Sequence, residues 1–227
     1  MAPTDTVRDM DYLAIRERSV RRLARLQLPD PGVLPLHSDE DFEWVRDVRG
    51  VTARCHAIAA ALAIQQGAPH QRIRRALRDN DLERWLAARE QRFLAHLEGE
   101  VTMDDEERHQ TTVDISWREE ALWALMWSVE LVDDLPPDEL CSREPFYQRL
   151  APDLDPANGR TDVLLRPLAE IVTMLDFYYL LHWNARNAQY HGQPWNSKIA
   201  PGAVLERRRA LEWLFQDVPW EDVDLGA

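Results

Sequence analysis

Charged side chains interrupt two apolar segments near the end of the sequence. Between residues 171 and 181 the only charged side chain is Asp176, and His182 follows directly after this segment. Farther along, Arg207 and Arg208 each lie on an apolar helical stripe, so at least one of them must point toward the core. Carboxylate, imidazole and guanidinium groups transfer protons and bind anions in active sites, so these residue types could carry chemistry.

Two interpretations of these charges stay open. In the first, which we favour, they form a buried ion-pair network that fixes the packing of three helices, because buried charges must be paired. In the second, they line a polar pocket in which Asp176 or Glu120 acts as the base, His182 acts as acid or base, and arginine holds an anionic substrate. The candidate cluster comprises Arg118, Glu120, Asp176, His182, Arg186, Glu206, Arg207 and Arg208.

No complete catalytic, metal-binding or phosphate-binding motif appears in the sequence, so we expect no cofactor and no metal. The consecutive acids of residues 104–107 lack the spacing and the glycine of a calcium loop, and we expect a mobile solvated loop over residues 98–114. Cys55 and Cys141 match no zinc pattern and are too few for a disulfide framework.

The overall charge narrows the range of partners. The 227 residues include 27 basic and 40 acidic side chains, for a net charge of -13. Nucleic-acid binding needs a local excess of lysine and arginine, so we expect no nucleic-acid partner. The acidic balance suits a soluble protein or one that binds a basic protein.

The sequence also indicates the cellular compartment in which the protein is expected. Its apolar runs are too short to cross a membrane, and residues 1–11 have no apolar run of the kind found in a secretory signal. With only two cysteines, a reducing compartment fits, and we expect a cytoplasmic protein with no membrane contact. The oligomeric state has no signature in the sequence.

Apolar periodicity is helical almost throughout, and alternating, strand-like segments are missing. The sequence therefore predicts an all-α fold, with about seven helices packed orthogonally around a central tryptophan-rich helix in one domain, residues 1–227. We expect residues 1–10 to be flexible and residues 133–160, which include five prolines, to form a long irregular excursion. Loops of this length are often lids or binding segments, so this one is a candidate wall of a cleft.

Capping residues and helix breakers set the expected boundaries. Ser38 with Asp41, and Ser116 with Glu119, match capping boxes, so we expect a helix to begin at each serine. The expected helices cover residues 11–27, 38–66, a segment after Pro69, 81–97, a segment from Ser116, 167–191 and a segment from Pro201.

The helix from Ser116 is expected to be the central one. Residues 121–129 carry no charge, and a helix that is apolar all round is surrounded by protein. We expect its tryptophans to fill the core, namely Trp117, Trp123 and Trp127. The first helix differs, because five arginines between Arg16 and Arg25 predict a solvated face.

Short stretches along the chain, each weakly specific alone, combine into a more specific pattern. They are Arg18-Ser19, Trp85-Leu86 with Glu90 and Phe93-Leu94, Ser116-Trp117-Arg118 with Glu120-Ala121-Leu122 and Leu125-Met126-Trp127, Asp176 with His182-Trp183 and Arg186, Glu206-Arg207 with Ala210-Leu211 and Trp213-Leu214, and Trp220 with Asp222-Val223. In this combination the chain, from about residue 12 to 224, resembles the bacterial family called domain of unknown function 4272.

The resemblance implies an all-α protein of this length, with no established activity, cofactor or catalytic residues. The pattern of that family ends in an Asp-Thr pair after the tryptophan segment. In this chain Val223 is followed by Asp224-Leu225-Gly226-Ala227, so no role of that pair carries over.

Two classes of function remain. We favour a non-catalytic binding or interaction module that sequesters or neutralises a basic partner protein through its acidic surface. The alternative is a small enzyme that uses the buried carboxylate, histidine and arginine cluster on an anionic small molecule. An open cleft around Asp176 and His182 would favour the enzyme, whereas a dry, fully paired cluster would favour the binding module.

Overall fold

The computed structural model describes residues 10–32, 34–141 and 163–226. Within these ranges the chain forms seven α-helices and no β-strand, so the predicted all-α class is confirmed. The α-helices are α1 (Tyr12–Arg25), α2 (Val48–Gln65), α3 (His70–Asp79), α4 (Ala88–Leu97), α5 (Asp105–Ser128), α7 (Leu168–Tyr190) and α8 (Pro201–Trp213). Short 3-10 helices cover Asp39–Phe42, Glu83–Trp85 and Trp220–Asp222.

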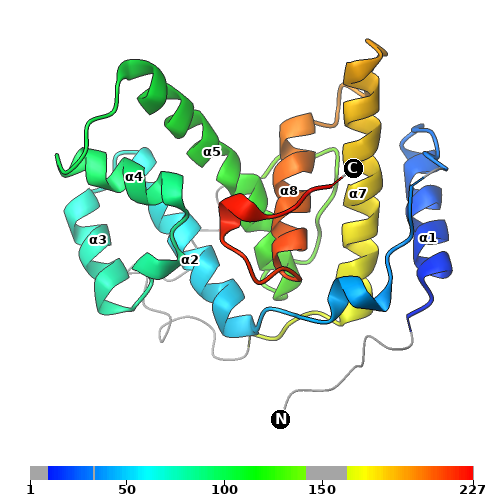
Figure 1. Cartoon of the computed structure of the whole chain (residues 1–227), viewed down its shortest axis with the longest axis horizontal. Helices are drawn as coiled ribbons and strands as arrows, with labels where there is room; N and C mark the ends of the chain where they lie inside the picture. The colour runs from blue at the N-terminus through cyan, green and yellow to red at the C-terminus, as the bar shows by residue number, and fades with distance from the viewer. Residues whose placement is uncertain (1–9, 33, 142–162, 227) are drawn as a thin grey trace.

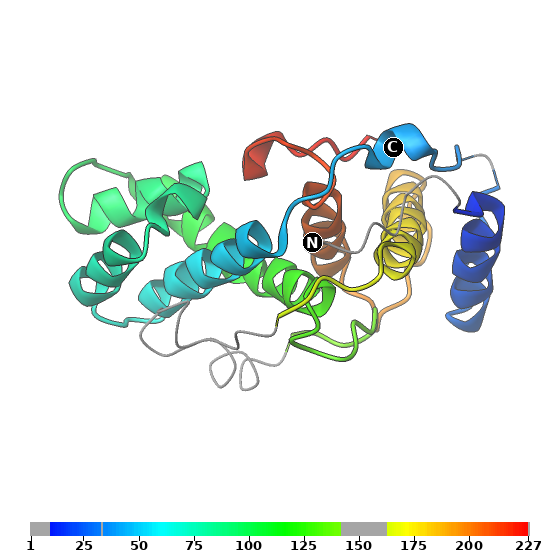
Figure 2. The ribbon, with the colours of Figure 1, turned by 90° about the horizontal axis from the view of Figure 1, so that it is seen from below.

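The helices follow one another across the molecule (Figure 1). α1 packs against α7, α7 against α8, α8 against α5, and α5 against α2, while α3 packs on α2 and α4 on α5. Figure 2 shows the same order from below, with the segment before α2 and the C-terminal tail on the same side of the helices. The contact between α5 and α8 therefore brings together helices that both carry predicted site residues. Orthogonal packing around one central helix, and the single domain, stay predictions.

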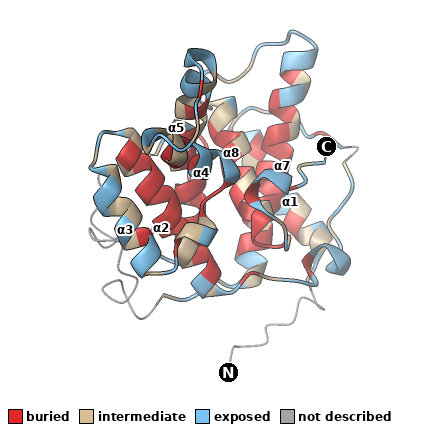
Figure 3. Ribbon diagram, turned by 60° about the vertical axis from the view of Figure 1, so that its left-hand side comes forward, coloured by how far each residue is buried: buried red, intermediate tan, exposed pale blue. Residues whose placement is uncertain are grey.

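Every α-helix contributes to one hydrophobic cluster. α7 is buried at residues 171, 172 and 174–182, and α5 at all but one of residues 120–128, so both helices are red over long stretches in Figure 3. These are the segments whose apolar residues lie on all sides of the helix, and such a helix is stable only when other helices surround it.

The helix expected from Ser38 begins later in the chain. The capping box of Ser38 and Asp41 is present, but it caps the 3-10 helix Asp39–Phe42, where the Ser38 N–H donates to Asp41 Oδ2 at 2.7 Å. α2 begins at Val48, because the Asp47 carboxylate accepts a hydrogen bond at 2.7 Å from a backbone N–H in the first turn.

The acidic run 104–107 begins a helix and is not the predicted loop. Asp104 is the N-cap of α5, and its carboxylate accepts a hydrogen bond from the Glu107 N–H at 2.8 Å. Acids in this first turn also interact favourably with the positive end of the helix dipole. Ser116 lies inside α5 and its hydroxyl donates to the Val113 carbonyl at 2.6 Å, so the second predicted capping box is wrong.

The tryptophans of α5 differ in burial. Trp127 is buried and Trp123 is half-buried, but Trp117 is 36% exposed. The prediction that all three fill the core is therefore wrong for Trp117, which lies at the surface where α5 meets α8.

Two further segments differ from the expected helices or fall outside the structure. The segment 81–97 is divided into the 3-10 helix Glu83–Trp85 and α4. Of the predicted excursion, residues 133–141 contain no α-helix, and residues 142–160 lie outside the described residues. The expectation for residues 1–10 likewise falls almost entirely outside them.

Far-ultraviolet circular dichroism measures this helix content directly. We expect a spectrum dominated by α-helix with little β signal, because the described residues contain seven α-helices and no strand. A spectrum dominated by β signal would contradict the fold.

Candidate functional site

The structure places the eight predicted site residues in different surroundings. Arg186 is exposed, and the others are buried. Arg207 and Arg208 are both buried, so the expectation that at least one of them points inward is met by both. The buried residues do not form one cluster, because their hydrogen bonds divide them into separate groups.

Arg207 and Glu120 form a buried pair between α8 and α5. Arg207 Nε and Nη2 donate to Glu120 Oε2 at 2.8 and 2.6 Å. Nη1 donates to Tyr178 Oη at 2.9 Å and to the Pro136 carbonyl, and Nη2 also donates to the Glu139 carbonyl at 2.6 Å. These bonds engage all five N–H groups that a guanidinium possesses, on a side chain that is 0% exposed.

The described part of the predicted excursion closes over this pair. The Cys141 N–H donates to Glu120 Oε1 at 2.8 Å, next to the two carbonyls that accept from Arg207. Residues 136–141 therefore tie α5 to α8 and leave the pair buried. The rest of the predicted cleft wall, residues 142–160, lies outside the described part of the chain.

A chain of alternating charges links α2, α4, α5 and α8. Arg54 donates to both oxygens of Glu90 at 2.6 and 2.8 Å, and Glu90 Oε1 lies 3.8 Å from Arg118 Nε. Arg118 Nη1 and Arg209 Nη1 each donate to one oxygen of Glu206 at 2.5 Å. Burial alone would raise the pKa of Glu90, but the guanidiniums of Arg54 and Arg118 outweigh it and hold that pKa below its usual value. We call these five residues the ion-pair chain.

Asp176 of α7 pairs with Arg16 of α1, a residue 160 positions away in the sequence. Arg16 Nε donates to Asp176 Oδ1 at 3.0 Å, and its terminal nitrogens donate to the carbonyls of Leu34 and Pro35 at 3.1 and 2.8 Å. His37 Nε2 lies 4.0 Å from Asp176 Oδ1. The side chain of Arg16 is only 14% exposed, so the predicted solvated arginine face of α1 is wrong at this position.

His182 of α7 accepts a hydrogen bond from Arg208 of α8. Its Nδ1 lies 2.8 Å from Arg208 Nη1, and a guanidinium can only donate, so Nδ1 carries no proton in this arrangement. Burial, followed by the charges of Arg208, Arg186 and Arg209, lowers the pKa of His182 to about 4. Arg208 also binds Glu212 at 3.2 Å. His182 is therefore neutral at pH 7, and one of its two ring nitrogens is occupied.

The predicted acid and base groups are poorly placed for catalysis. Asp176 is 1% exposed, Glu120 is 4% exposed and His182 is 7% exposed. A general base must come within hydrogen-bond distance of the proton that it removes, and here arginine already occupies both carboxylates. Their geometry favours the first interpretation, in which the charges pair to hold helices together.

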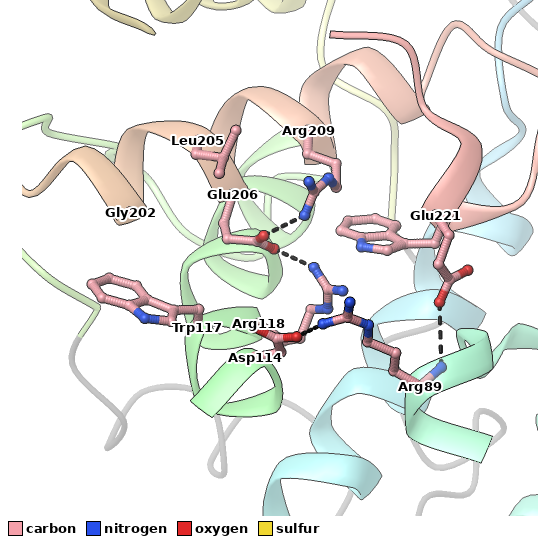
Figure 4. A pocket seen from close by; sticks show the side chains of 10 residues that line it. Arg89, Asp114, Trp117, Arg118, Gly202, Leu205, Glu206, Arg209 and Glu221 are labelled. Atoms are coloured by element: carbon pink, nitrogen blue, oxygen red, sulfur yellow. Dashed lines mark hydrogen bonds and ion pairs between the residues drawn. The ribbon is translucent and has the colours of Figure 1, made fainter. Parts of the chain in front are cut away.

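A cavity of about 400 Å³ lies where α4, α5, α8 and the C-terminal tail meet (Figure 4). In Figure 4 the side chains of Arg89 and Asp114 point toward each other and form an ion pair. The backbone N–H of Arg89 donates to Glu221 Oε1 at 3.5 Å. Six of the lining residues are charged, namely Arg89, Asp114, Arg118, Glu206, Arg209 and Glu221.

Of the predicted site residues, the cavity includes only Arg118 and Glu206. Sequence reasoning missed Arg89 and Arg209, because each lies among other charged residues on a helix that also has a solvated side, and it placed Asp114 at the end of an expected solvated loop. A usable signal existed for Arg16, which shares a helix face with the buried residues Ser19 and Leu23.

Neither a metal site nor a membrane span is found in the part of the chain that the structure describes. Within residues 10–32, 34–141 and 163–226, no group of three His, Cys, Asp or Glu side chains is placed to hold a metal ion. No helix in these ranges is long and apolar enough to cross a bilayer.

The lowered pKa of His182 predicts a loss of stability in acid. Between about pH 6.5 and about pH 4 the unfolded chain binds more protons at this residue than the folded protein does, so the free energy of unfolding falls as the pH drops. The fall amounts to about 3 kcal/mol for this one group. Burial also lowers the pKa of His37, and that histidine acts in the same direction.

Urea unfolding of the wild type and of His182→Gln, at about pH 7 and about pH 4, measures this effect. The glutamine carbonyl can still accept from Arg208 but does not titrate, so the variant is expected to lose less stability in acid. Equal losses in both proteins would contradict the assignment of a neutral, buried His182.

Comparisons with known proteins find a family. No curated protein and no solved structure matches the chain. A protein-family match covers residues 15–223, and the matching family is described as a domain of unknown function, DUF4272. These residues include α2 to α8 and nearly all of α1, together with every predicted site residue. Because the match extends over nearly the whole sequence, the chain belongs to the DUF4272 family.

Proposed function

We propose that the protein is a non-catalytic binding module whose acidic surface holds a basic partner protein. The observation that carries the proposal is the pairing of the candidate acid and base residues. Asp176 and Glu120 are buried and bound by Arg16 and Arg207, and His182 is bound by Arg208. Paired groups of this kind stabilise the helices, so a partner is expected to bind at the surface.

The distribution of charge supports a basic partner. Five arginines are buried in the described residues, and exposed acidic side chains outnumber exposed basic ones there. At the start of α5, Asp104, Asp105 and Glu106 are all exposed. Such a surface attracts a positively charged protein and steers its approach.

The alternative, a small enzyme that acts on an anionic small molecule, has less support. It would need substrate to reach Asp176 or His182, and both side chains are buried against arginine. We place the binding module in the cytoplasm, where the free thiols of Cys55 and Cys141 suit a reducing environment.

Affinity capture tests the partner. The immobilised protein is incubated with lysate of the source cell, and bound proteins are eluted with rising salt and identified by mass spectrometry. We expect a basic protein that elutes as salt screens the charges. The variant Asp105→Asn/Glu106→Gln keeps the N-cap Asp104 and is expected to capture less of it, whereas Glu17→Gln, which removes an exposed acid from α1, is the matched control.

Capture that is insensitive to salt, or equal for all three proteins, would contradict the proposal. So would the recovery of only neutral or acidic partners, because these have no reason to bind an acidic surface.

Nucleic acid is not an expected partner. The net charge of -13 repels phosphate, and five of the arginines are buried in the described part of the chain. Gel-shift titrations with duplex and single-stranded DNA and with RNA are expected to show no binding at physiological salt. Salt-dependent binding at micromolar protein would contradict this prediction.

A further inference from the structure

The ion-pair chain carries an uneven charge. It runs in the order Arg54, Glu90, Arg118, Glu206 and Arg209, so three guanidiniums face two carboxylates. The excess of one positive charge is not cancelled within the chain. Because buried charges need partners, a chain with one excess positive charge favours an additional anion at an accessible end.

The accessible end is Arg209. Arg54 is buried deep between α2 and α4, with its side chain 1% exposed, whereas the side chain of Arg209 is 23% exposed and lines the cavity. Burial lowers the pKa of Arg209, and Arg118 and Arg89 act in the same direction, against the opposite influence of Glu206 and Glu221. An anion beside Arg209 would therefore relieve the repulsion among the guanidiniums of Arg209, Arg118 and Arg89.

The remaining carboxylates at the cavity compensate Arg209 only in part. Asp114 is already paired with Arg89, as Figure 4 shows. Glu221 is exposed at the rim, and its carboxylate accepts from the Arg89 backbone N–H. Water screens an exposed carboxylate, so it compensates a partly buried guanidinium only weakly.

The opposite wall of the cavity is apolar and flat. It is formed by the indole of Trp117, which is 36% exposed, together with Leu205. Gly202 lets this ring lie against α8, because a Cβ at that position would be 3.0 Å from the nearest ring atom. An exposed indole held flat on a helix is a surface on which another planar ring can stack.

We propose that this cavity binds a small aromatic monocarboxylate, with its carboxylate on Arg209 and its ring against Trp117. The cavity of about 400 Å³ has the size of a small-molecule site. One negative charge balances the ion-pair chain, whereas a dianion such as a phosphate monoester would leave a negative excess. This site is separate from the acidic surface of the proposed function and goes beyond it.

Benzoate is a suitable probe, with benzamide as its uncharged analogue and phenyl phosphate as the dianion. Binding is followed by the shift of the Trp117 indole N–H resonance in nuclear magnetic resonance spectra, assigned with Trp117→Phe. We expect saturable benzoate binding with a dissociation constant of about 1 mM or tighter. Benzamide and phenyl phosphate are each expected to bind at least about tenfold more weakly, because benzamide carries no charge and phenyl phosphate carries two negative charges, whereas the ion-pair chain has an excess of one positive charge.

Arg209→Gln is the decisive variant. It removes the excess charge and leaves Glu206 paired with Arg118, so the fold is expected to hold, which urea unfolding verifies. Benzoate affinity is expected to fall about tenfold or more, because a charge-assisted hydrogen bond is lost. Arg75→Gln, which changes a side chain that is 83% exposed on α3, is the matched control and is expected to bind like the wild type.

Gly202→Ala provides a second test that leaves every charge in place. The added methyl group pushes the Trp117 ring away from α8, so benzoate binding is expected to weaken. The proposal is overturned if benzoate at about 20 mM causes no saturable shift, if benzamide binds equally well, or if Arg209→Gln binds like the wild type. None of these results bears on the capture of a basic protein, so the two proposals fail independently.

Discussion

Replacing Arg207 with methionine is expected to lower the free energy of unfolding by about 3–5 kcal/mol. The substitution leaves Glu120 buried without its guanidinium partner, and it also removes the donors to the Pro136 and Glu139 carbonyls and to Tyr178. Methionine keeps much of the side-chain volume, so the loss reports mainly on charge and hydrogen bonding. An effect of this size is a large fraction of the stability of a typical domain.

Urea unfolding of the wild type and Arg207→Met measures this loss. Arg21→Met is the matched control, because Arg21 is 61% exposed and its ion pair with Glu17 on the same helix is worth only a few tenths of a kcal/mol. A denaturation midpoint for Arg207→Met that equals that of the control would contradict the structural role of Arg207.

Replacing Asp176 with alanine is expected to destabilise the fold by about 3 kcal/mol, the lower end of the range for a broken buried pair. Arg16 loses its carboxylate but keeps hydrogen bonds to the carbonyls of Leu34 and Pro35, and its side chain is 14% exposed. The pair joins α1 to α7, so the variant is also expected to loosen α1 first.

Urea unfolding and amide hydrogen exchange in α1 check this prediction. Glu17→Ala on the outer face of α1 is the control, since its side chain is 70% exposed and the loss is expected to stay below about 1 kcal/mol. An unchanged midpoint for Asp176→Ala would refute the structural interpretation and would favour an open polar site at this residue.

The helical class was predictable because apolar residues repeat with helical spacing nearly everywhere. Residues 171–181 of α7 carry only one charge, Asp176, and residues 121–128 of α5 carry none, and that composition indicates a helix surrounded by protein whatever its neighbours are. Periodicity is a local property, so it could be read without knowledge of the tertiary structure.

Helix boundaries were harder to predict, because the same short motif has more than one use. Ser116 with Glu119 has the spacing of a capping box, yet the chain is already helical there. The acids of residues 104–107 suggested a solvated loop, but acidic residues also favour the first turn of a helix. Whether such a motif begins a helix depends on the conformation of the preceding segment, and that conformation depends on where the segment packs.

For the site, the sequence indicated some of the charges that turn inward but not their partners, and it missed the buried Arg54 and Glu90. Arg207 and Arg208 lie on apolar stripes of α8, which was enough to predict that at least one of them is buried. The partner of Asp176 lies 160 residues away on α1, and such a pairing follows from the order in which helices pack. The cavity was missed for the same reason, because α4, α5, α8 and the tail form it together.

A double-mutant cycle on Glu120 and Arg207 tests most directly the claim that the buried charges pair to hold the helices. The free energy of unfolding is measured in urea for the wild type, Glu120→Leu, Arg207→Met and the double variant. Each single change is expected to cost about 3–5 kcal/mol, because each leaves a buried, unpaired charge. The double variant leaves no such charge, so its loss is expected to be smaller than the sum of the single losses by about 2 kcal/mol or more. Losses that simply add would show that the two side chains do not stabilise each other, and would contradict the account.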